Sequence, residues 1–462
     1  MKYLFAALFF WVALPVRAGD LPPTVAQALK GAQIPPASVA VMVQPVDAGT
    51  PLVSFNAGQA MNPASVMKLV TTYAALDLLG PAYTWKTAAF IDAEPADGRL
   101  PGNLYLKGSG DPKFAQEHLW ALLRQLRVRG IGHIAGDVIL DRSAFNVPPA
   151  TGNFDDKPMR PYNVEPDALL VNFRALRFVL SPEAASVRLL VETPSDGLPI
   201  DNRLQLSKGD CRDDWKDRIA VRLLPNGGLE FTGSYAALCG ERALNLSPLP
   251  PDAQVGCLFA ALWKEMGGTL GGKVRPGPIP ATARLAAEQE SPPLAEVVRD
   301  INKYSNNVMA RQLFLTLGNG DGAATPERAR QRVYAWLGQR KLAFRELEME
   351  NGSGLSRRER ISADSLNRLL LDAWQSPVMP EFVSSLPIVG IDGTMKKRMV
   401  DSGARGRAHL KSGTLDGVKT VSGYALDSRG RRYAVTFLIN HPRAREGQAA
   451  IDALLQWVAE LR

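Results

Sequence analysis

The chain has 462 residues, of which 46% are hydrophobic and 22% charged, which is typical of a globular protein with room for two or three domains. Its net charge of +8 comes from scattered basic residues, which excludes the concentrated basic surface of a nucleic-acid-binding protein. Because the four histidines have no ligand spacing, we expect neither a metal site nor another cofactor.

The N-terminus has the pattern of a secretory signal peptide. Met1-Lys2 is a short basic start, residues 3–14 are apolar, and small residues precede a cleavage site after Ala18. An uncleaved membrane anchor is the alternative, which the shortness of the apolar run disfavours. The sequence therefore predicts a signal peptide over 1–18 and a periplasmic protein. It leaves peripheral membrane association and the oligomeric state open.

Two strand patterns, at 38–44 and 51–56, come before a predicted helix over 62–79. Asn62 suits the N-cap of this helix, because its side chain can accept a backbone N–H that has no partner within the helix. Pro63 suits the first helical position, where its missing N–H costs nothing.

The middle of the chain alternates short elements with turns. The patterns predict strands at 104–106 and 136–140 and helices at 117–130 and 255–266. From about 164 to 246, short strand patterns alternate with Pro, Gly and Asp turns, which indicates a β-rich unit. Residues 267–290 are rich in Gly, Pro and Ala, and we expect them to be a return connection.

Helical patterns dominate again after residue 292. The apolar spacing predicts helices at 294–317, 326–342, 362–374 and 447–461, and strands at 408–411, 420–427 and 432–440. Strands, helices, then strands and a closing helix favour a helix-and-sheet domain. The stretch from 84 to 290 is then an insertion into that domain.

The three cysteines fit an exported protein, in which disulfides can form. Cys211 and Cys239 flank two strand-like pieces, so we predict that they form a disulfide. Cys257 lies in an apolar helical pattern, and we expect a buried thiol there.

Ser65 and Lys68 are the first candidate catalytic pair. They lie three residues apart at a helix start, so both side chains point to one face. A serine hydroxyl becomes a nucleophile when a nearby base takes its proton, and a lysine with a lowered pKa can be that base. The alternative is a chance pair on a surface helix, because Ser-x-x-Lys arises often by chance.

Two further short motifs offer partners for this pair. Ser305 and Asn307 lie in a helical segment, where a hydroxyl could relay a proton and an amide could hold a substrate carbonyl. A helix-capping polar cluster is the alternative there. Lys411-Ser412-Gly413-Thr414 closes a strand pattern, and its lysine and hydroxyls could hold a carboxylate. Gly413 would let a ligand approach the backbone, while an exposed turn with a solvated lysine is the alternative.

The order S-x-x-K, S-x-N, K-[ST]-G resembles the signature of the serine penicillin-recognising enzymes. Ser65 and Ser305 are 305 − 65 = 240 residues apart, and this long insertion resembles the class C low-molecular-mass penicillin-binding proteins, the D-alanyl-D-alanine carboxypeptidase/endopeptidases. The Gly-Ser-Gly-Asp-Pro turn at 108–112 and the Asn-Gly-Ser-Gly-Leu-Ser-Arg stretch at 351–357 are similar to stretches of the same family.

The resemblance implies an α/β (α+β) fold in which a transpeptidase-like domain carries two smaller inserted domains, one of them β-rich. The expected domains are the catalytic domain at 19–83 and 291–462, a first inserted domain at 84–163 and 248–290, and a β-rich second inserted domain at 164–247. The resemblance also implies an acyl-enzyme on Ser65, peptidoglycan stem peptides as substrates and β-lactam antibiotics as inhibitors. No nucleic acid is expected as a partner.

Site roles follow from the same resemblance. The backbone N–H groups of Ser65 and Thr414 are expected to form the oxyanion hole. Arg357 and an acid of the pair Asp155-Asp156, with Asp156 preferred, are expected to line a pocket for the diamino acid of the stem peptide. Asp416 stands where the family has other residues, Gln among them. A β-lactamase or esterase on the same fold, or a wall-binding protein with a retired site, are the alternatives. Glu165 begins a stretch faintly like the deacylation loop of class A β-lactamases, but it precedes the S-x-N motif, which disfavours that role.

Overall fold

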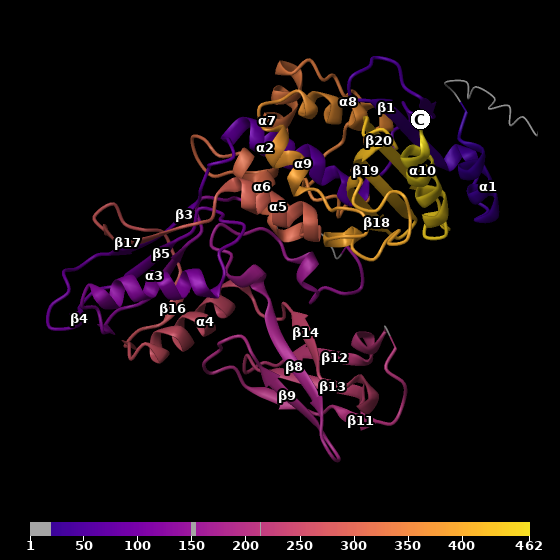
Figure 1. Cartoon of the computed structure of the whole chain (residues 1–462). Helices are drawn as coiled ribbons and strands as arrows, with labels where there is room; N and C mark the ends of the chain where they lie inside the picture. The colour runs from indigo at the N-terminus through magenta and orange to yellow at the C-terminus, as the bar shows by residue number, and fades with distance from the viewer. Residues whose placement is uncertain (1–19, 149–153, 213) are drawn as a thin grey trace, which may run out of the picture.

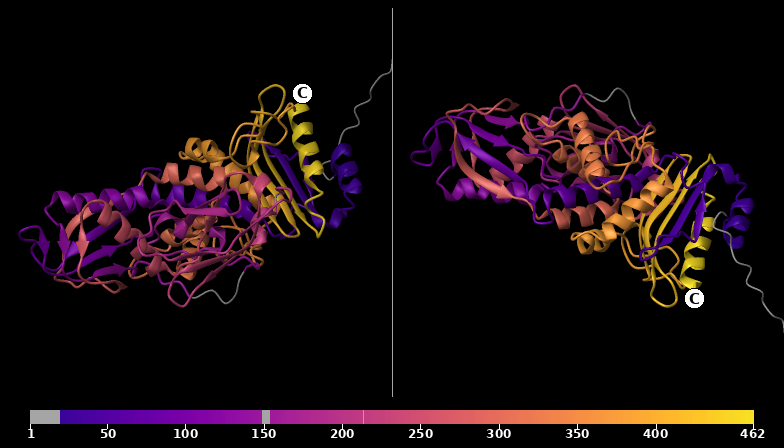
Figure 2. Two further views of the ribbon diagram at one scale, coloured as in Figure 1. Left: turned by 90° about the horizontal axis from the view of Figure 1, so that it is seen from below. Right: turned by 90° about the horizontal axis from the view of Figure 1, so that it is seen from above.

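The computed structural model describes residues 20–148, 154–212 and 214–462, so the predicted signal peptide over 1–18 lies outside the described residues. These residues form three bodies, each with its own sheets and apolar core (Figure 1). In Figure 2 the sheet that contains β18 to β20 lies toward one end of the molecule, and the elements from β3 to α3 lie at the other. No helix of the described residues has the length and apolar character needed to span a bilayer.

The first body is built on an antiparallel sheet in the order β18-β19-β20-β1-β2. Its strands are β1 (Val39–Pro45), β2 (Val53–Phe55), β18 (Ala408–Leu415), β19 (Val418–Leu426) and β20 (Arg432–Asn440). Every residue of β1 is buried. Because successive strand side chains point to opposite faces, Val41 and Val43 enter one apolar core and Ala40 and Met42 enter the other.

Helices cover both faces of this sheet. On one face, α1 (Pro23–Gly31) and α10 (Gln448–Glu460) pack together against the strands. The other face is covered by α2 (Lys68–Leu79), α5 (Leu294–Tyr304), α6 (Asn307–Leu317), α7 (Pro326–Gln339), α8 (Ala363–Trp374) and α9 (Met379–Ser385). The predicted combination of helices and a sheet is therefore confirmed, and these elements come from both ends of the chain.

The stretch 294–317, predicted as one helix, forms two. Helix α5 ends at Tyr304, Ser305 has a left-handed backbone with φ 56° and ψ 36°, and Asn306 caps α6 by accepting a hydrogen bond from the Met309 N–H. The prediction was wrong because the apolar spacing continues on both sides of the break. The break moves the Ser305 side chain out of any helix face.

The second body surrounds a mixed sheet in the order β16-β7-β5-β3-β17. The strands are β3 (Lys86–Ile91), β5 (Leu104–Lys107), β7 (Val138–Asp141), β16 (Val274–Pro276) and β17 (Arg284–Glu290). A smaller parallel sheet joins β4 (Arg99–Leu100), β6 (His133–Ile134) and β15 (Thr269–Leu270), and the helices are α3 (Gln116–Val128) and α4 (Pro251–Glu265). The stretch 267–290, predicted as a return connection, supplies β15, β16 and β17 to these two sheets.

The third body is β-rich, as predicted. One sheet joins β8 (Leu176–Pro182), β9 (Val187–Val191) and β14 (Arg242–Leu246), and the other joins β10 (Ile200–Asn202), β11 (Gln205–Ser207), β12 (Ile219–Leu223) and β13 (Leu229–Ala236). The predicted Cys211–Cys239 disulfide is present. Cys257 is a free thiol, but it is only half-buried, because it lies on the side of α4 that faces the third body. The predicted domain boundaries stay a prediction.

Removing the disulfide is expected to destabilise the third body. Its cysteines are 28 residues apart. Cross-linking a loop of that length lowers the entropy of the unfolded chain, which raises the free energy of the unfolded state by about 3–4 kcal/mol at 25 °C. Cys211→Ser with Cys239→Ser should lower the free energy of unfolding by about that amount, measured by urea denaturation followed by fluorescence. Cys257→Ser is the matched control. An equal loss of unfolding free energy in this control would show that the effect does not come from the Cys211–Cys239 disulfide.

Candidate active site

Ser65 lies in a short 3-10 turn, η2 (Ala64–Met67), immediately before α2. The predicted α-helical start at Pro63 is therefore wrong. Ala64 has a positive φ of 47°, and its N–H donates to Asn62 Oδ1 at 2.8 Å, so Asn62 caps the turn before the helix. The turn directs Ser65 toward the first residue of α2, which is Lys68.

The Lys68 side chain is fully buried, and its Nζ has three polar neighbours. It lies 3.0 Å from Ser65 Oγ and 2.6 Å from Asn307 Oδ1, and it donates to the Ser353 carbonyl. The amide and carbonyl oxygens can only accept hydrogen bonds, so they take two N–H groups of the amine. A neutral amine has two N–H groups and one lone pair, so the lone pair faces the Ser65 hydroxyl.

The surroundings of Lys68 favour this neutral form. Burial, above all, lowers the pKa of Lys68 well below its ordinary value, and the positive charges of Lys411 and Arg311 lower it further. The carboxylate of Glu359 acts in the opposite direction. An amine of lowered pKa at hydrogen-bond distance from a serine hydroxyl can serve as a general base.

The second motif pairs with the third. Lys411 is fully buried, and its Nζ donates to Ser305 Oγ at 2.7 Å and to the Ser412 carbonyl at 2.8 Å. Burial lowers the pKa of Lys411 to about 7. The left-handed backbone of Ser305 presents its hydroxyl to this amine, and Asn307, at the start of α6, presents its amide to Lys68. The structure therefore joins all three motifs through two lysines.

The third motif lies inside strand β18, which continues to Leu415, beyond the predicted end of the strand at Lys411. Strand β18 is the edge of its sheet. The Ala408 carbonyl and the Leu410 N–H point away from β19, toward the segment 387–389. Backbone direction alternates along a strand, so the Ser412 and Thr414 backbone groups point to this same side. This orientation suits the predicted use of the Thr414 N–H in an oxyanion hole.

Gly413 allows the Ser65 turn to approach β18. A Cβ at this position would lie 2.8 Å from the Pro63 carbonyl oxygen, 3.0 Å from the Ala64 Cβ and 2.2 Å from Thr420 Oγ1. Thr420 Oγ1 in turn donates to the Pro63 carbonyl at 2.8 Å. The protein's own turn therefore accounts for the missing side chain, and the approach of a ligand to the Gly413 backbone stays a prediction.

The stretch 351–357 holds the nucleophile turn from the other side, and sequence reasoning did not assign it this role. Gly354 has a φ of +79°, and a Cβ there would lie 1.9 Å from the Ala64 carbonyl oxygen and 2.7 Å from Ser65 N. The Gly352 carbonyl accepts from Thr71 Oγ1 at 2.7 Å, one turn along α2 from Lys68. The two glycines in the motif were the available signal, since they allow close backbone approach.

Arg357 and Asp416 meet at the end of β18. Arg357 Nη1 donates to the backbone carbonyl of Asp416 at 2.8 Å, and its guanidinium lies 5.0 Å from the ring centre of Phe154. Both residues were predicted to bind substrate. Their contact is through the Asp416 backbone, so the aspartate carboxylate is not the group that orients the arginine.

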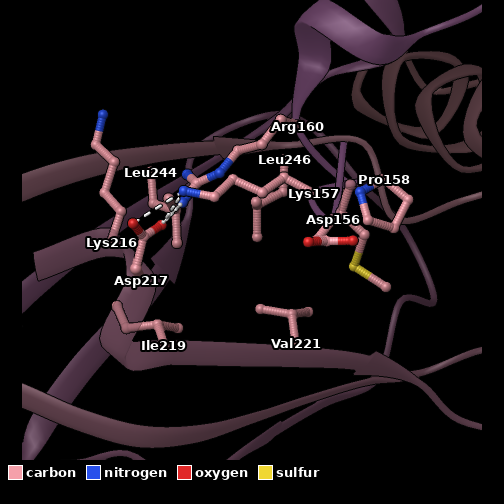
Figure 3. Close-up of a pocket in the computed structure, with 11 residues that line it drawn as sticks. Asp156, Lys157, Pro158, Arg160, Lys216, Asp217, Ile219, Val221, Leu244 and Leu246 are labelled. Atoms are coloured by element: carbon pink, nitrogen blue, oxygen red, sulfur yellow. Dashed lines mark hydrogen bonds and ion pairs between the residues drawn. The ribbon is translucent and has the colours of Figure 1, made fainter. Parts of the chain in front are cut away.

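Asp156, the third of these residues, lines a different pocket. Figure 3 shows its carboxylate near Val221, while Lys157 and Arg160 converge on Asp217. The cavity has a volume of about 410 Å³ and lies against the third body. Among the described residues, the structure records no hydrogen bond or ion pair between Asp156 and Arg357. The structure thus brings Arg357 to the Asp416 backbone, while Asp156 lines the cavity beside the third body.

The Glu165 segment docks on α6. Arg311 Nη1 donates to the Val164 carbonyl at 3.0 Å and lies 3.5 Å from Glu165 Oε1. Gln312 accepts from the Asp167 N–H and donates to the Asp167 carbonyl. The segment therefore ties the inserted part of the chain to the helix that carries Asn307.

Comparisons with known proteins place this arrangement among peptidases. Residues 21–461 match the model of the D-Ala-D-Ala carboxypeptidase 3 (S13) family. A D-alanyl-D-alanine carboxypeptidase of Actinomadura sp. (strain R39) is 28% identical over 91% of this chain and 81% of its own. The D-alanyl-D-alanine carboxypeptidase DacB of Haemophilus influenzae is 24% identical over 84% of this chain and 82% of its own.

Solved structures agree on the fold. Penicillin binding protein 4 (dacB) of Haemophilus influenzae matches with a TM-score of 0.79 at 22% identity, covering 95% of this chain and 99% of that one. A second structure of that protein is a complex with a β-lactam. The expected penicillin-binding fold with extra domains is therefore confirmed.

Proposed function

The chain belongs to the D-Ala-D-Ala carboxypeptidase 3 (S13) family and is a serine-type D-Ala-D-Ala carboxypeptidase, and on this premise we propose that Ser65 is the nucleophile that attacks peptidoglycan stem peptides. The observation that carries the proposal is the set of three contacts at Lys68 Nζ. Two acceptor oxygens, on Asn307 and Ser353, leave the lone pair of the amine facing the Ser65 hydroxyl at 3.0 Å.

Acylation then follows from the positions of the two lysines. Lys68 takes the proton of Ser65, and Ser65 Oγ forms a bond to the carbonyl carbon of the penultimate D-Ala. The negative oxygen is stabilised by the N–H groups of Ser65 and Thr414. The bond to the terminal D-Ala nitrogen breaks, and Ser305 passes its hydroxyl proton to this leaving amine while it takes a proton from protonated Lys411.

The remaining groups hold the substrate. Asn307 uses its oxygen on Lys68, which leaves its amide N–H groups for the acyl carbonyl of the peptide. Lys411, with the hydroxyls of Ser412 and Thr414 and the close backbone at Gly413, binds the terminal carboxylate. Arg357 and Asp416, beside the end of β18, and Asp156 in its separate pocket contribute to the binding of the rest of the stem peptide.

Water completes the cycle by hydrolysing the ester on Ser65. β-Lactams acylate the same serine and leave it slowly, which is supported by the β-lactam complex of the Haemophilus influenzae relative. The predicted signal peptide supports a periplasmic location, where stem peptides are exposed. Cleavage of peptide cross-links uses the same groups, with the cross-linked strand as the leaving amine.

The test is intact-mass spectrometry of the protein with benzylpenicillin, followed by peptide mapping, together with release of D-Ala from a peptide that ends in D-Ala-D-Ala. A stable adduct on Ser65 and D-Ala release are the expected results. An intact drug without an adduct would indicate a retired site. A hydrolysed drug without an adduct, and no D-Ala release, would indicate a β-lactamase.

The binding of the terminal carboxylate is expected to weaken above neutral pH. The pKa of Lys411 is lowered to about 7, so the amine is charged below that pH and neutral above it. A hydrogen bond to a charged group contributes about 1.5–3 kcal/mol, so KM should rise roughly tenfold between pH 6 and 8.5. Steady-state kinetics with a peptide ending in D-Ala-D-Ala measures this rise. The same peptide with an amidated C-terminus is the control, and an equal rise in the control would contradict the role of Lys411.

A further inference from the structure

Glu359 is a fully buried carboxyl group that has no part in the mechanism above. Its Oε1 accepts hydrogen bonds from three successive backbone N–H groups, those of Glu350 at 3.1 Å, Asn351 at 3.1 Å and Gly352 at 3.0 Å. One carboxylate oxygen therefore fixes the backbone at the start of the 351–357 stretch. A surface loop without such an anchor would be free to move.

The anchored backbone is the part that contacts the nucleophile and its base. The next residue in the chain, Ser353, supplies the carbonyl that accepts a hydrogen bond from Lys68, and Gly352 supplies the carbonyl that accepts from Thr71. Gly354 then lies against the peptide between Ala64 and Ser65. The Glu359 carboxylate is therefore linked to Lys68 Nζ by the Gly352 N–H, from which it accepts a hydrogen bond, and by the Ser353 carbonyl, which accepts one from Lys68.

The other carboxylate oxygen of Glu359, Oε2, differs from Oε1 in its hydrogen bonding. Oε2 is buried and has no hydrogen-bond partner among the described residues. A buried carboxylate with a bare oxygen is costly unless an opposite charge compensates it. Lys68 supplies such a charge when it is protonated: its charge then lowers the pKa of Glu359, and the Glu359 charge raises the pKa of Lys68 in return.

From these contacts we infer that Glu359 is a positioning residue for the general base: its carboxylate holds the Ser353 carbonyl against Lys68 and places a negative charge behind the amine. The inference rests on the proposed function, in which Lys68 accepts the proton of Ser65. The carbonyl fixes which way the lone pair points, because it takes one of the two N–H groups of the neutral amine.

The negative charge of Glu359 changes the pKa of Lys68 in a direction that can be measured. Lys68 is influenced by Lys411 from β18 and Arg311 from α6, which lower its pKa, and by Glu359, which raises it. Around Glu359 lie Arg311, Tyr334 from α7 and Glu350, while burial is the main cause that raises the pKa of Glu359 itself. Removing the negative charge therefore lowers the pKa of Lys68. Because acylation needs neutral Lys68, the acidic limb of its pH profile moves to lower pH.

The experiment compares Glu359→Gln with Glu359→Ala in the full-length protein. The rate constant of acylation by benzylpenicillin is measured from pH 4.5 to 9, and circular dichroism reports the folded fraction. The glutamine oxygen keeps an acceptor for the three N–H groups, so its plateau rate should stay within about threefold of the wild-type rate while its acidic limb moves down by about half a pH unit or more. The alanine releases the backbone, so its plateau rate per folded molecule should fall at least about tenfold.

Glu346→Gln is the matched control. Glu346 also accepts a backbone N–H, that of Ser362 at 3.1 Å, but Glu346 is not among the charges that act on Lys68. Its pH profile should coincide with that of the wild type. A Glu359→Gln profile that also coincides with the wild type would overturn the inference, and so would an unchanged plateau rate in Glu359→Ala. If Glu359→Ala fails to fold, the limb of Glu359→Gln decides alone. Failure of the proposed function is separate, since the wild type itself would then form no adduct.

Discussion

Ser65→Ala is expected to abolish both penicillin adduct formation and D-Ala release, with a loss of at least about 10⁴-fold in kcat. The hydroxyl supplies the oxygen that forms the acyl-enzyme, and alanine has no group that can replace it. The fold should be unchanged, because Lys68 keeps its hydrogen bonds to Asn307 and Ser353. Intact-mass spectrometry and a D-Ala release assay measure the two losses.

Ser186→Ala is the matched control for this variant. Ser186 is an exposed serine of the third body whose hydroxyl contacts only Glu183 among the described residues. The Ser186→Ala variant should be acylated on Ser65 at the wild-type rate. An adduct that persists in Ser65→Ala would show that another residue is the nucleophile, and peptide mapping would identify it.

Lys68→Met is expected to reduce the rate of acylation by about 10² to 10⁴-fold, the contribution of a well-placed general base. Methionine has a similar length and suits a fully buried position, so the loss is chemical and not a loss of packing. The acidic limb of the pH profile should also disappear, because the group that titrates has been removed. Stopped-flow measurement with a chromogenic cephalosporin across pH 5 to 9 gives both results.

The exposed lysine of α1, Lys30, provides the comparison. Lys30→Met removes the same charge far from the site and should leave the rate and the pH profile unchanged. A Lys68→Met variant that keeps the acidic limb would show that another group titrates there and would contradict the role of Lys68 as the base.

The elements and the motif order could be predicted from the sequence because both are local signals. Strand β20 has the predicted bounds, and β1 and α10 differ from the prediction by one residue at each end. The three motifs were found because each is only three or four residues long. The contacts of Lys68 with Asn307 and of Lys411 with Ser305 depend on the tertiary fold, which no local sequence pattern encodes.

Three features of the site were not predicted from the sequence, for two physical reasons. The break at Ser305 is a backbone event inside a continuous apolar pattern, so helical spacing does not reveal it. The reason for Gly413 is a contact with Pro63, 350 residues earlier in the chain (413 − 63 = 350). Glu359 was missed because an acid on a polar stretch is usually solvated, and only the fold buries it. The Gly413 contact and the burial of Glu359 depend on the tertiary fold, whereas the Ser305 break is a local backbone conformation.

The pairing of β1 with β20 sets a condition on when this enzyme becomes active. Val39 pairs with Ile439, so the partner of the first strand is synthesised 400 residues later (439 − 39 = 400). Contacts of such long range form late and slowly. The edge strand that carries Lys411 is also C-terminal and belongs to the same sheet, so a partly synthesised chain has Ser65 but lacks the third motif. Covalent labelling by a β-lactam therefore detects only those molecules in which β1 has paired with β20. The time at which labelling begins in the living cell then reports when this pairing is complete.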